Sequence, residues 1–379
     1  MPSARPILLV TRNFPPARGG IETMAFELVK QGVAEGRKLA VLHVGQNPRH
    51  RPPEGLVAYK HVAGTGRWSA LLASLFWIPL LALRLRAGLV VNMQVTTAPG
   101  SLLARLLLRT PYMVLGMGLE LLPGGIPPWR MVRGLALRGA RKVISISRFT
   151  DSLLVAFGVP PDRRAVINPG TRLFPDLVPR PKADLFGAGA ENRFVLLSIS
   201  RLVPRKGVDK AIEATALVAK ERPEVLLCVG GSGPDSDRLK NLASQLGMGE
   251  HVRFLGRVSE ADMGPAYAAA DLFVLPSRTS IDPPDAEGFG IVFLEAGACG
   301  TPSLGGDSGG VPDAVRDGET GLLAPPEDAR ALADRILRLM GDAELLRRLG
   351  VNAKAHAEDS TWPKAAGRYF AAFEGGLQK

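Results

Sequence analysis

The sequence predicts an α/β fold with two doubly wound, Rossmann-like domains. A chain of 379 residues exceeds the usual size of a single hydrophobic core. Short apolar, β-branched runs recur along the chain with helical patterns between them, as in parallel sheets covered by helices. Several of these runs lead into glycine-containing turns that precede a helix, which is the connection that doubly wound sheets use.

The first domain begins with an expected strand at residues 7–10, followed by Gly19, Gly20 and an amphipathic helix that runs to Lys30. A strand, a Gly-Gly turn and a helix together offer backbone N–H groups to phosphate, although most such turns have only a structural role. Further strands are expected at residues 39–44, 89–91, 113–115 and 143–147.

The domain boundary is expected near residue 175, because the segment from Pro175 to Pro181 contains three prolines and is typical of a linker. We therefore predict a first domain over residues 1–174 and a second over residues 175–359. Another helix should begin at Pro363, since proline is favoured in the first turn of a helix.

Charge is distributed unevenly between these halves. Residues 1–175 hold 23 Lys and Arg against 7 Asp and Glu, a net of +16, whereas the remainder has a net of −5. The basic half should meet an anionic partner, such as lipid headgroups, a lipid-linked phosphate or nucleic acid. The sequence has no helix-turn-helix, RNP or zinc-finger pattern, so nucleic acid is not expected.

Residues 127–142 are the strongest candidate for contact with an anionic membrane. Arg130, Arg133, Arg138 and Arg141 fall on one side of a predicted helix, and Trp129, Met131 and Leu135 could accompany them at a bilayer surface. A solvated basic face is the competing interpretation.

Location and metal content are also indicated by the sequence. The apolar run near the N-terminus is too short for a signal peptide, and the uncharged segment 68–83 is shorter than the roughly 20 residues needed to cross a bilayer. We interpret 68–83 as a core or interface helix. Both cysteines lie in apolar segments, which favours the reducing cytoplasm and no disulfide framework. The basic first half indicates peripheral attachment of such a protein to the inner face of the membrane. The five histidines show no metal spacing, so no bound metal is expected.

The segment from Glu287 to Glu295 is the strongest site candidate, because it combines two carboxylates, a glycine-containing turn and a helix start. Gly290 permits close backbone approach, and an apolar helix is expected to begin near Phe289. The free N–H groups of its first turn would bind an anion. The two glutamates, eight residues apart, could hold the two ends of a nucleotide sugar with its diphosphate over the helix start.

A second candidate is the loop that carries Arg201 and Lys206. Arginine binds phosphate in a bidentate manner and lysine acts as a point charge, so the two could converge on a diphosphate. The next strand leads into Gly230-Gly-Ser-Gly, which superficially suggests a dinucleotide site but lacks the full Gly-x-Gly-x-x-Gly pattern.

Four strings, in this order, resemble the signature of retaining GT-B glycosyltransferases: Phe14-Pro-Pro-x-x-Gly-Gly-Ile-Glu22, Arg201-Leu-x-x-x-Lys-Gly207, the Glu287 to Glu295 segment, and Asp307-Ser-Gly-Gly-Val-Pro-Asp313. The amino-acid sequence of these strings is similar to that of bacterial phosphatidylinositol mannosyltransferases. The resemblance implies two domains facing across a cleft, with a last helix, about 360–379, that crosses back to complete the first domain. It also implies a nucleotide diphosphate sugar as substrate, either GDP-mannose or a UDP-sugar, with no separate cofactor, and a glycan or lipid-linked acceptor.

The same resemblance assigns roles to single residues. The implied catalytic residues are Arg201, Lys206 and Glu287. The implied donor-binding residues are Gly19, Gly20, Gly231, Arg257, Val258, Phe289, Gly290, Ile291 and Glu295. Met117 stands where the family usually has a histidine that faces the donor sugar, and methionine cannot carry a proton. Met117 and Glu120 are therefore candidate sugar or acceptor contacts rather than catalytic groups.

Two other functions stay open from the sequence. One is a nucleotide-sugar epimerase or a phosphorylase on the same fold. The other is a catalytically silent partner protein that binds the nucleotide sugar, for which Met117 is the motivating residue.

Overall fold

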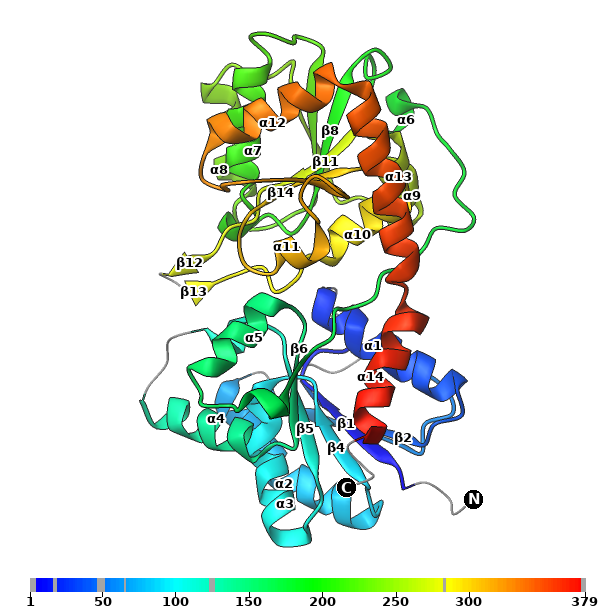
Figure 1. Cartoon of the computed structure of the whole chain (residues 1–379), viewed down its shortest axis with the longest axis vertical. Helices are drawn as coiled ribbons and strands as arrows, with labels where there is room; N and C mark the ends of the chain where they lie inside the picture. The colour runs from blue at the N-terminus through cyan, green and yellow to red at the C-terminus, as the bar shows by residue number, and fades with distance from the viewer. Residues whose placement is uncertain are drawn as a thin grey trace. The chain divides into compact units, whose positions relative to one another are not determined.

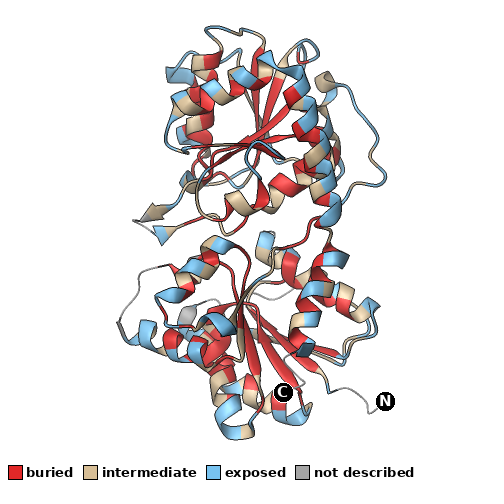
Figure 2. Ribbon diagram, viewed as in Figure 1, coloured by how far each residue is buried: buried red, intermediate tan, exposed pale blue. Residues whose placement is uncertain are grey.

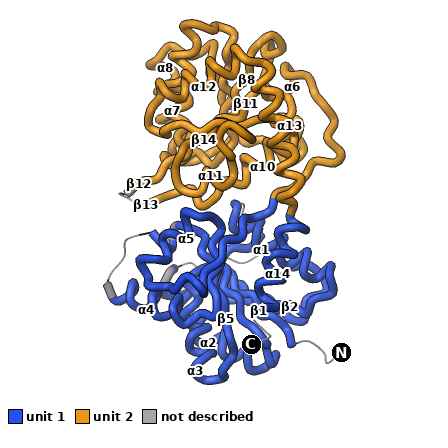
Figure 3. Tube along the Cα trace, in the orientation of Figure 1, with its two compact units in different colours: residues 1–170, 362–379 blue, residues 171–361 orange. Residues whose placement is uncertain are grey.

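A computed structural model describes residues 5–15, 19–45, 52–64, 66–122, 127–281 and 284–375. The chain forms two compact units, the first made of residues 1–170 and 362–379 and the second of residues 171–361 (Figure 3). The sequence placed the corresponding boundaries at 174/175 and near 360. Each unit is an α/β domain with a parallel sheet, as predicted.

Unit 1 contains a seven-stranded sheet in the order β3-β2-β1-β4-β5-β6-β7, and every described pairing in it is parallel (Figure 1). Its strands are β1 (Ile7–Thr11), β2 (Leu39–Gly45), β3 (Ala58–Ala63), β4 (Leu89–Asn92), β5 (Tyr112–Gly116), β6 (Lys142–Ser145) and β7 (Arg164–Val166). Its α-helices are α1 (Gly20–Ala34), α2 (Arg67–Arg84), α3 (Ala98–Leu108), α4 (Pro127–Gly139), α5 (Arg148–Val155) and α14 (Trp362–Gly375).

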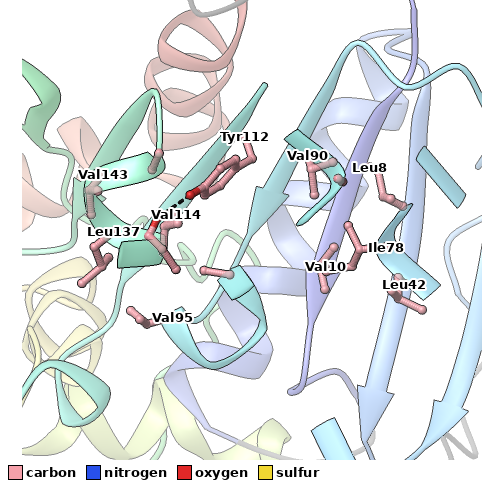
Figure 4. Packing of buried hydrophobic residues seen from close by; sticks show 14 of the residues in the cluster. Leu8, Val10, Leu42, Ile78, Val90, Val95, Tyr112, Val114, Leu137 and Val143 are labelled. Carbon is pink, nitrogen blue, oxygen red and sulfur yellow. Dashed lines mark hydrogen bonds between the residues drawn. The ribbon is translucent and has the colours of Figure 1, made fainter. Parts of the chain in front are cut away.

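The core of unit 1 lies on the central strands. Residues of β1, β2, β4 and β5 are buried at every position, since helices cover both faces of the sheet (Figure 2). This explains why these strands are continuous apolar runs rather than alternating patterns. Figure 4 shows the packing around Val10, Val90 and Val114.

The last helix, α14, completes unit 1. It packs on α1, where a Cβ on Gly32 would lie 2.4 Å from the Phe370 ring, so only glycine fits there. The Tyr369 hydroxyl donates a hydrogen bond to the Ile167 carbonyl. A segment from the far end of the chain thereby contributes buried aromatic side chains to the first domain.

Unit 2 contains a six-stranded sheet in the order β10-β9-β8-β11-β14-β15, with parallel pairings throughout its described part. Its strands are β8 (Phe194–Ile199), β9 (Val225–Gly230), β10 (Val252–Gly256), β11 (Leu272–Leu275), β14 (Ser303–Gly306) and β15 (Gly321–Ala324). Its α-helices are α6 (Lys182–Phe186), α7 (Val208–Val218), α8 (Ser236–Gln245), α9 (Glu260–Ala269), α10 (Ile291–Ala298), α11 (Val311–Ala314), α12 (Ala329–Gly341) and α13 (Ala343–Asp359). A short hairpin, β12 (Ser280–Ile281) with β13 (Pro284–Asp285), stands apart from this sheet.

Both sheets have a point at which the direction of strand succession reverses. In unit 1 it lies between β1 and β4, and in unit 2 between β8 and β11. In open α/β sheets ligands bind outside the carboxyl ends of the strands at such a reversal. The loops after β1, β4, β8 and β11 are therefore the places to look for a site.

One expectation for the basic half is corrected by the structure. Arg133 does not share an exposed face with the other arginines of α4, because it is only 5% exposed and donates a 2.5 Å hydrogen bond to the Glu120 carbonyl. Helix α2, for which a core or an interface helix was expected, has a buried face with Ala70, Ile78 and Ala82 and an exposed face on which Trp68 and Phe76 are each 63% exposed. Within the described ranges, no helix has the length and apolar character required to cross a bilayer.

Candidate functional site

The predicted site residues of unit 2 gather at one edge of its sheet. Arg201 follows β8, Gly231 follows β9, Arg257 and Val258 follow β10, and the loop with Glu287 follows β11. These are all carboxyl ends of parallel strands. Two serine hydroxyls at the same edge, Ser200 Oγ and Ser277 Oγ, are buried and have no hydrogen-bond partner among the described residues. Buried polar groups without a partner are costly, so a ligand that bonds them is a reasonable expectation.

Lys206 and Glu287 form the central contact of this edge. Lys206 Nζ pairs with Glu287 Oε2, and Arg205 Nη1 donates to the same oxygen over 2.9 Å. Arg205 Nε also lies 3.2 Å from Asp285 Oδ1. The structure thus brings together two of the three predicted catalytic residues and adds Arg205, which the sequence analysis missed.

The loop that carries Arg205 and Lys206 is held in place by Arg278. Arg278 Nε donates to the Pro204 carbonyl over 2.9 Å, and its backbone N–H donates to the Arg205 carbonyl over 2.8 Å. The guanidinium also bonds both carboxylate oxygens of Asp209, at 3.0 and 2.8 Å. Both bonds come from Nη2, and charge-assisted contacts of this kind are strong enough to hold the Arg278 guanidinium against Asp209. Arg278 is therefore a positioning residue for the two cations.

The pKa of Glu287 reflects its surroundings. Its side chain is 13% exposed, and this burial would raise the pKa of the carboxyl, but the Lys206 and Arg205 cations outweigh it and leave the pKa below the usual value. Glu287 is therefore ionised at neutral pH. The Glu287 carboxylate can therefore hold the Lys206 ammonium group in one position while Lys206 keeps its positive charge.

The start of α10 is built from two interlocking loops. α10 begins at Ile291 rather than near Phe289, because Gly290 has φ 98° and stands just outside the helix. Gly310 N–H donates to the Glu287 carbonyl over 2.8 Å, and a Cβ on Gly310 would lie 2.0 Å from the Gly288 carbonyl oxygen. The Gly309-Gly310 pair is therefore needed so that the two loops can approach. Phe289 itself is buried, at 3% exposure.

Glu295 lies one helical turn further along and has its own partners. Arg172 Nε lies 3.1 Å from Glu295 Oε1, and the Tyr267 hydroxyl donates to Oε2 over 3.3 Å. Burial raises the pKa of Glu295, which Arg172 and Tyr267 only partly oppose. Arg172 was not found from the sequence, because it stands alone in the chain without a recognisable pattern.

The remaining predicted residues of unit 2 differ in exposure. Gly231 has φ 129°, and a Cβ there would lie 1.8 Å from the Ser200 carbonyl oxygen, so glycine is required. Arg201 and Arg257 are exposed, and neither makes a hydrogen bond or ion pair with the part of the chain that the structure describes. Both guanidinium groups are thus available to an anionic ligand.

Unit 1 places Gly19 and Gly20 directly at the N-terminus of α1, after β1. Asn13 Nδ2 donates to Glu22 Oε1 over 2.6 Å, and a Cβ on Gly19 would lie 2.5 Å from Glu22 Oε2. The Glu22 carboxylate therefore lies beside the helix N-terminus that the sequence assigned to phosphate. Negative charge is favourable at this position.

Met117 and Glu120 lie together after β5. The Met117 N–H donates to Glu120 Oε1 over 2.8 Å, and the Met117 side chain is only 4% exposed. Burial raises the pKa of Glu120, against the opposing effects of the Met117 N–H and the Arg133 guanidinium. Glu120 is thus a buried, hydrogen-bonded carboxyl rather than an ordinary solvated one. Across the described ranges, no group of three or more His, Cys, Asp or Glu side chains is placed to hold a metal ion.

Family models match both units. A model described as Glycosyl transferases group 1 matches residues 184–356, and one described as Glycosyl transferase 4-like domain matches residues 19–170. The GDP-mannose-dependent alpha-(1-6)-phosphatidylinositol monomannoside mannosyltransferase of Mycolicibacterium smegmatis is 31% identical, over 93% of this chain and 94% of the relative. A D-inositol 3-phosphate glycosyltransferase of Thermobispora bispora is 35% identical over 60% of this chain and 54% of the relative.

Solved structures share the fold of the whole chain. Sucrose-phosphate synthase from Thermosynechococcus elongatus has a TM-score of 0.83 at 22% identity, covering 98% of this chain and 99% of its own. Anabaena HepE in complex with UDP has a TM-score of 0.79 at 22% identity, covering 97% of this chain and 99% of its own. The matched models, the relative that spans nearly the full chain and these neighbours confirm the resemblance seen in the sequence. The chain belongs to the group 1 glycosyl transferases and is a glycosyltransferase with the GT-B fold.

Proposed function

We propose that this protein is a retaining, metal-independent hexosyltransferase that moves mannose from GDP-mannose to a lipid-linked acceptor at an anionic membrane surface. The observation that carries the proposal is the cation cluster next to the start of α10, where Lys206 and Arg205 are both held by Glu287. Positive charge fixed beside a helix N-terminus is suited to a diphosphate leaving group, because that group gains negative charge as the sugar departs.

The proposed reaction needs no protein base. The bond between the sugar C1 and the diphosphate oxygen breaks while the acceptor hydroxyl oxygen bonds C1 on the same face. The hydroxyl proton passes to the departing diphosphate. Lys206 and the first N–H groups of α10 stabilise the negative charge, and exposed Arg201 can add a bidentate contact. Glu287 keeps Lys206 in place. Buried Met117 takes no part in proton transfer.

The donor and the acceptor are proposed from the relatives. The Mycolicibacterium smegmatis relative is named as GDP-mannose-dependent and as acting on a phosphatidylinositol monomannoside. Because it covers nearly the whole chain, we extend both the nucleotide sugar and the lipid class to this protein. Neighbouring structures contain UDP or UDP-glucose, which makes UDP-sugars the comparison donors.

Attachment to an anionic membrane is supported by the exposed face of unit 1. On α2, Trp68, Leu72, Phe76 and Leu83 are exposed, and on α4, Met131 and Leu135 are exposed next to Arg130 and Arg138. The Trp68 and Trp129 rings lie 6.4 Å apart, which joins the two helices into one surface. Aromatic side chains with arginines beside them suit the headgroup region of an anionic bilayer. We refer to these exposed α2 and α4 residues as the aromatic face.

The test is a transfer assay on the full chain with GDP-mannose and vesicles that contain phosphatidylinositol monomannoside. We expect a mannosylated lipid with the α configuration retained, undiminished by EDTA and lost in the absence of acceptor. UDP-glucose serves as the donor control. A β-linked product would contradict retention, and a strict need for Mn²⁺ or Mg²⁺ would contradict metal independence. Conversion of the donor without acceptor would favour an epimerase, and donor binding without any conversion would favour a silent partner.

A further inference from the structure

A second basic site lies in unit 1, at the opposite end of the sheet from the loops described above. It is a pocket of about 300 Å³ lined by Arg105, Arg109, Arg141, Arg163, Pro111, Tyr112 and Ala140. Pro111 precedes β5, Arg141 precedes β6, and Arg163 precedes the start of β7, so the pocket lies at the amino ends of three strands. It is therefore distinct from the predicted donor and acceptor residues.

The pocket is rich in positive charge. None of the three residues Arg105, Arg109 and Arg163 forms an ion pair with a carboxylate in the described ranges. No Asp or Glu lines the pocket. Arg105 Nη1 donates to the Gly139 carbonyl, and Arg163 Nη1 donates to the Arg138 carbonyl over 3.1 Å. Both carbonyls belong to the last turn of α4.

Capping of helix ends explains only part of this cluster. The C-termini of α3 and α4 each carry about half a negative charge, whereas the guanidinium groups of Arg105, Arg109 and Arg163 together carry three positive charges. Each guanidinium has five N–H donors, and the bonds to α4 use one from Arg105 and one from Arg163. The remaining donors and most of the positive charge are left for another anion.

Arg109 adds an independent observation from the backbone. It ends α3 with φ 57°, in the left-handed region that glycine adopts more readily. An arginine here accepts unfavourable backbone geometry, yet its side chain makes no described hydrogen bond or ion pair within the protein. Residues held in such conformations are often found at ligand sites.

We propose that this pocket binds the phosphate group of a second ligand, separate from the nucleotide-sugar donor. Arg109 and Arg163 supply bidentate contacts, and Arg105 and Arg141 supply further positive charge. The phosphate can come from a soluble phosphorylated molecule or from the headgroup of an anionic lipid. The volume is ample for a diphosphate-sized anion but does not enclose a nucleotide sugar.

The test compares substitutions at two arginines that share the same backbone geometry. Arg109→Gly removes the guanidinium and relieves the left-handed backbone, so the variant should fold at least as well as the wild type. Arg86→Gly is the matched control, because Arg86 also has positive φ, 48°, and is exposed but does not line the pocket. Arg163→Gln is a second pocket variant that leaves α3 untouched.

Calorimetric titration of the full chain with inorganic pyrophosphate should show a site that persists in Lys206→Met and is weakened at least about tenfold in Arg109→Gly and Arg163→Gln. Arg86→Gly should bind as the wild type does. Co-sedimentation with phosphatidylcholine vesicles containing phosphatidylglycerol forms the second arm. Loss of pyrophosphate binding in the pocket variants identifies a soluble ligand, and loss of vesicle binding alone identifies a headgroup. Unchanged binding of both in Arg109→Gly and Arg163→Gln would overturn the proposal.

Discussion

Lys206 and Glu287, 81 residues apart in the chain, meet through Nζ and Oε2 at the carboxyl edge of the second sheet. The contact joins the loop after β8 to the loop after β11, which are the two loops on either side of the strand-order reversal. Two sequence motifs that were separate candidates thus form one charged site. We expect this contact to affect both the stability of unit 2 and the rate of sugar transfer.

Lys206→Met should reduce both stability and transfer. The change leaves Glu287 with Arg205 as its remaining cation, so we expect a loss of about 2–3 kcal/mol in the free energy of unfolding of unit 2. Removal of a charge that stabilises the leaving group should lower kcat about 10²-fold or more. Chemical denaturation and steady-state kinetics measure the two effects. Lys240→Met, at an exposed position of α8, is the control and should change neither. A Lys206→Met enzyme with normal kcat would remove Lys206 from the mechanism.

The two glutamates of the Glu287 to Glu295 segment should affect stability with opposite dependence on pH. The folded-state pKa of Glu287 lies below the ordinary 4.5, so the stability it contributes is present above about pH 4.5 and is lost as the pH falls through the folded value. The pKa of Glu295 is raised, so its contribution is greatest below about pH 4.5 and is lost as the pH rises through its folded value.

Glu287→Gln and Glu295→Gln separate these effects. The stability difference between wild type and Glu287→Gln should grow with rising pH below about 4.5, and that between wild type and Glu295→Gln should shrink with rising pH above it. Denaturant unfolding between about pH 3 and 7 measures both differences. Equal slopes for the two variants would show that the segment does not hold its carboxylates in different environments.

Gly310→Ala should distort the loop before α10 through a steric clash alone. Gly310 has φ −88°, which alanine adopts freely, but the new Cβ would lie 2.0 Å from the Gly288 carbonyl oxygen. We expect a loss of about 2 kcal/mol or more in unit 2 stability and weaker nucleotide binding. Gly341→Ala, where no heavy atom lies within 4 Å of the added Cβ, should leave both unchanged. Thermal unfolding and nucleotide titration would show whether the two alanine variants differ.

The sequence predicted the architecture well, because buried parallel strands are continuous apolar runs and glycine turns mark their carboxyl ends. It located the loops of Arg201, Lys206 and Glu287 for the same reason. It could not show that Lys206 and Glu287 pair, because the contact depends on the order of strands in the sheet. The sequence analysis missed Arg172 because its partner, Glu295, is remote in the chain. It missed Arg205 because this residue lies beside Lys206 in a charge-rich string. The prediction that Arg133 lies on an exposed face was wrong, because helical periodicity shows which residues share a face but not whether other residues pack against that face.

The aromatic face should bind anionic bilayers in part through its apolar residues. Replacing Trp68 and Phe76 by Gln should weaken vesicle co-sedimentation even at low salt, whereas replacing Arg130 and Arg138 by Gln should weaken it mainly for anionic vesicles, by about 1 kcal/mol per arginine. Vesicles of phosphatidylcholine with and without phosphatidylglycerol separate the two contributions. Val351→Gln, at an exposed apolar position of unit 2, is the control. If the Trp68 and Phe76 variant bound as tightly as the wild type, the aromatic face would not be the contact surface.

The last prediction concerns Met117, which stands where the resemblance noted in the sequence leads us to expect a histidine. Its side chain is buried and its N–H is bonded to Glu120, so the loop is ordered without an imidazole. If Lys206, Arg205 and the start of α10 provide most of the stabilisation of the leaving group, the wild type should transfer sugar, and Met117→His should change kcat by less than about tenfold. Met117→Leu, which conserves volume, is the control for packing. Donor affinity must be measured alongside kcat, because an imidazole next to Glu120 could alter binding alone. The opposite result would be a wild type that binds donor without turnover, together with an active Met117→His variant. That result would show that transfer depends on an imidazole at position 117.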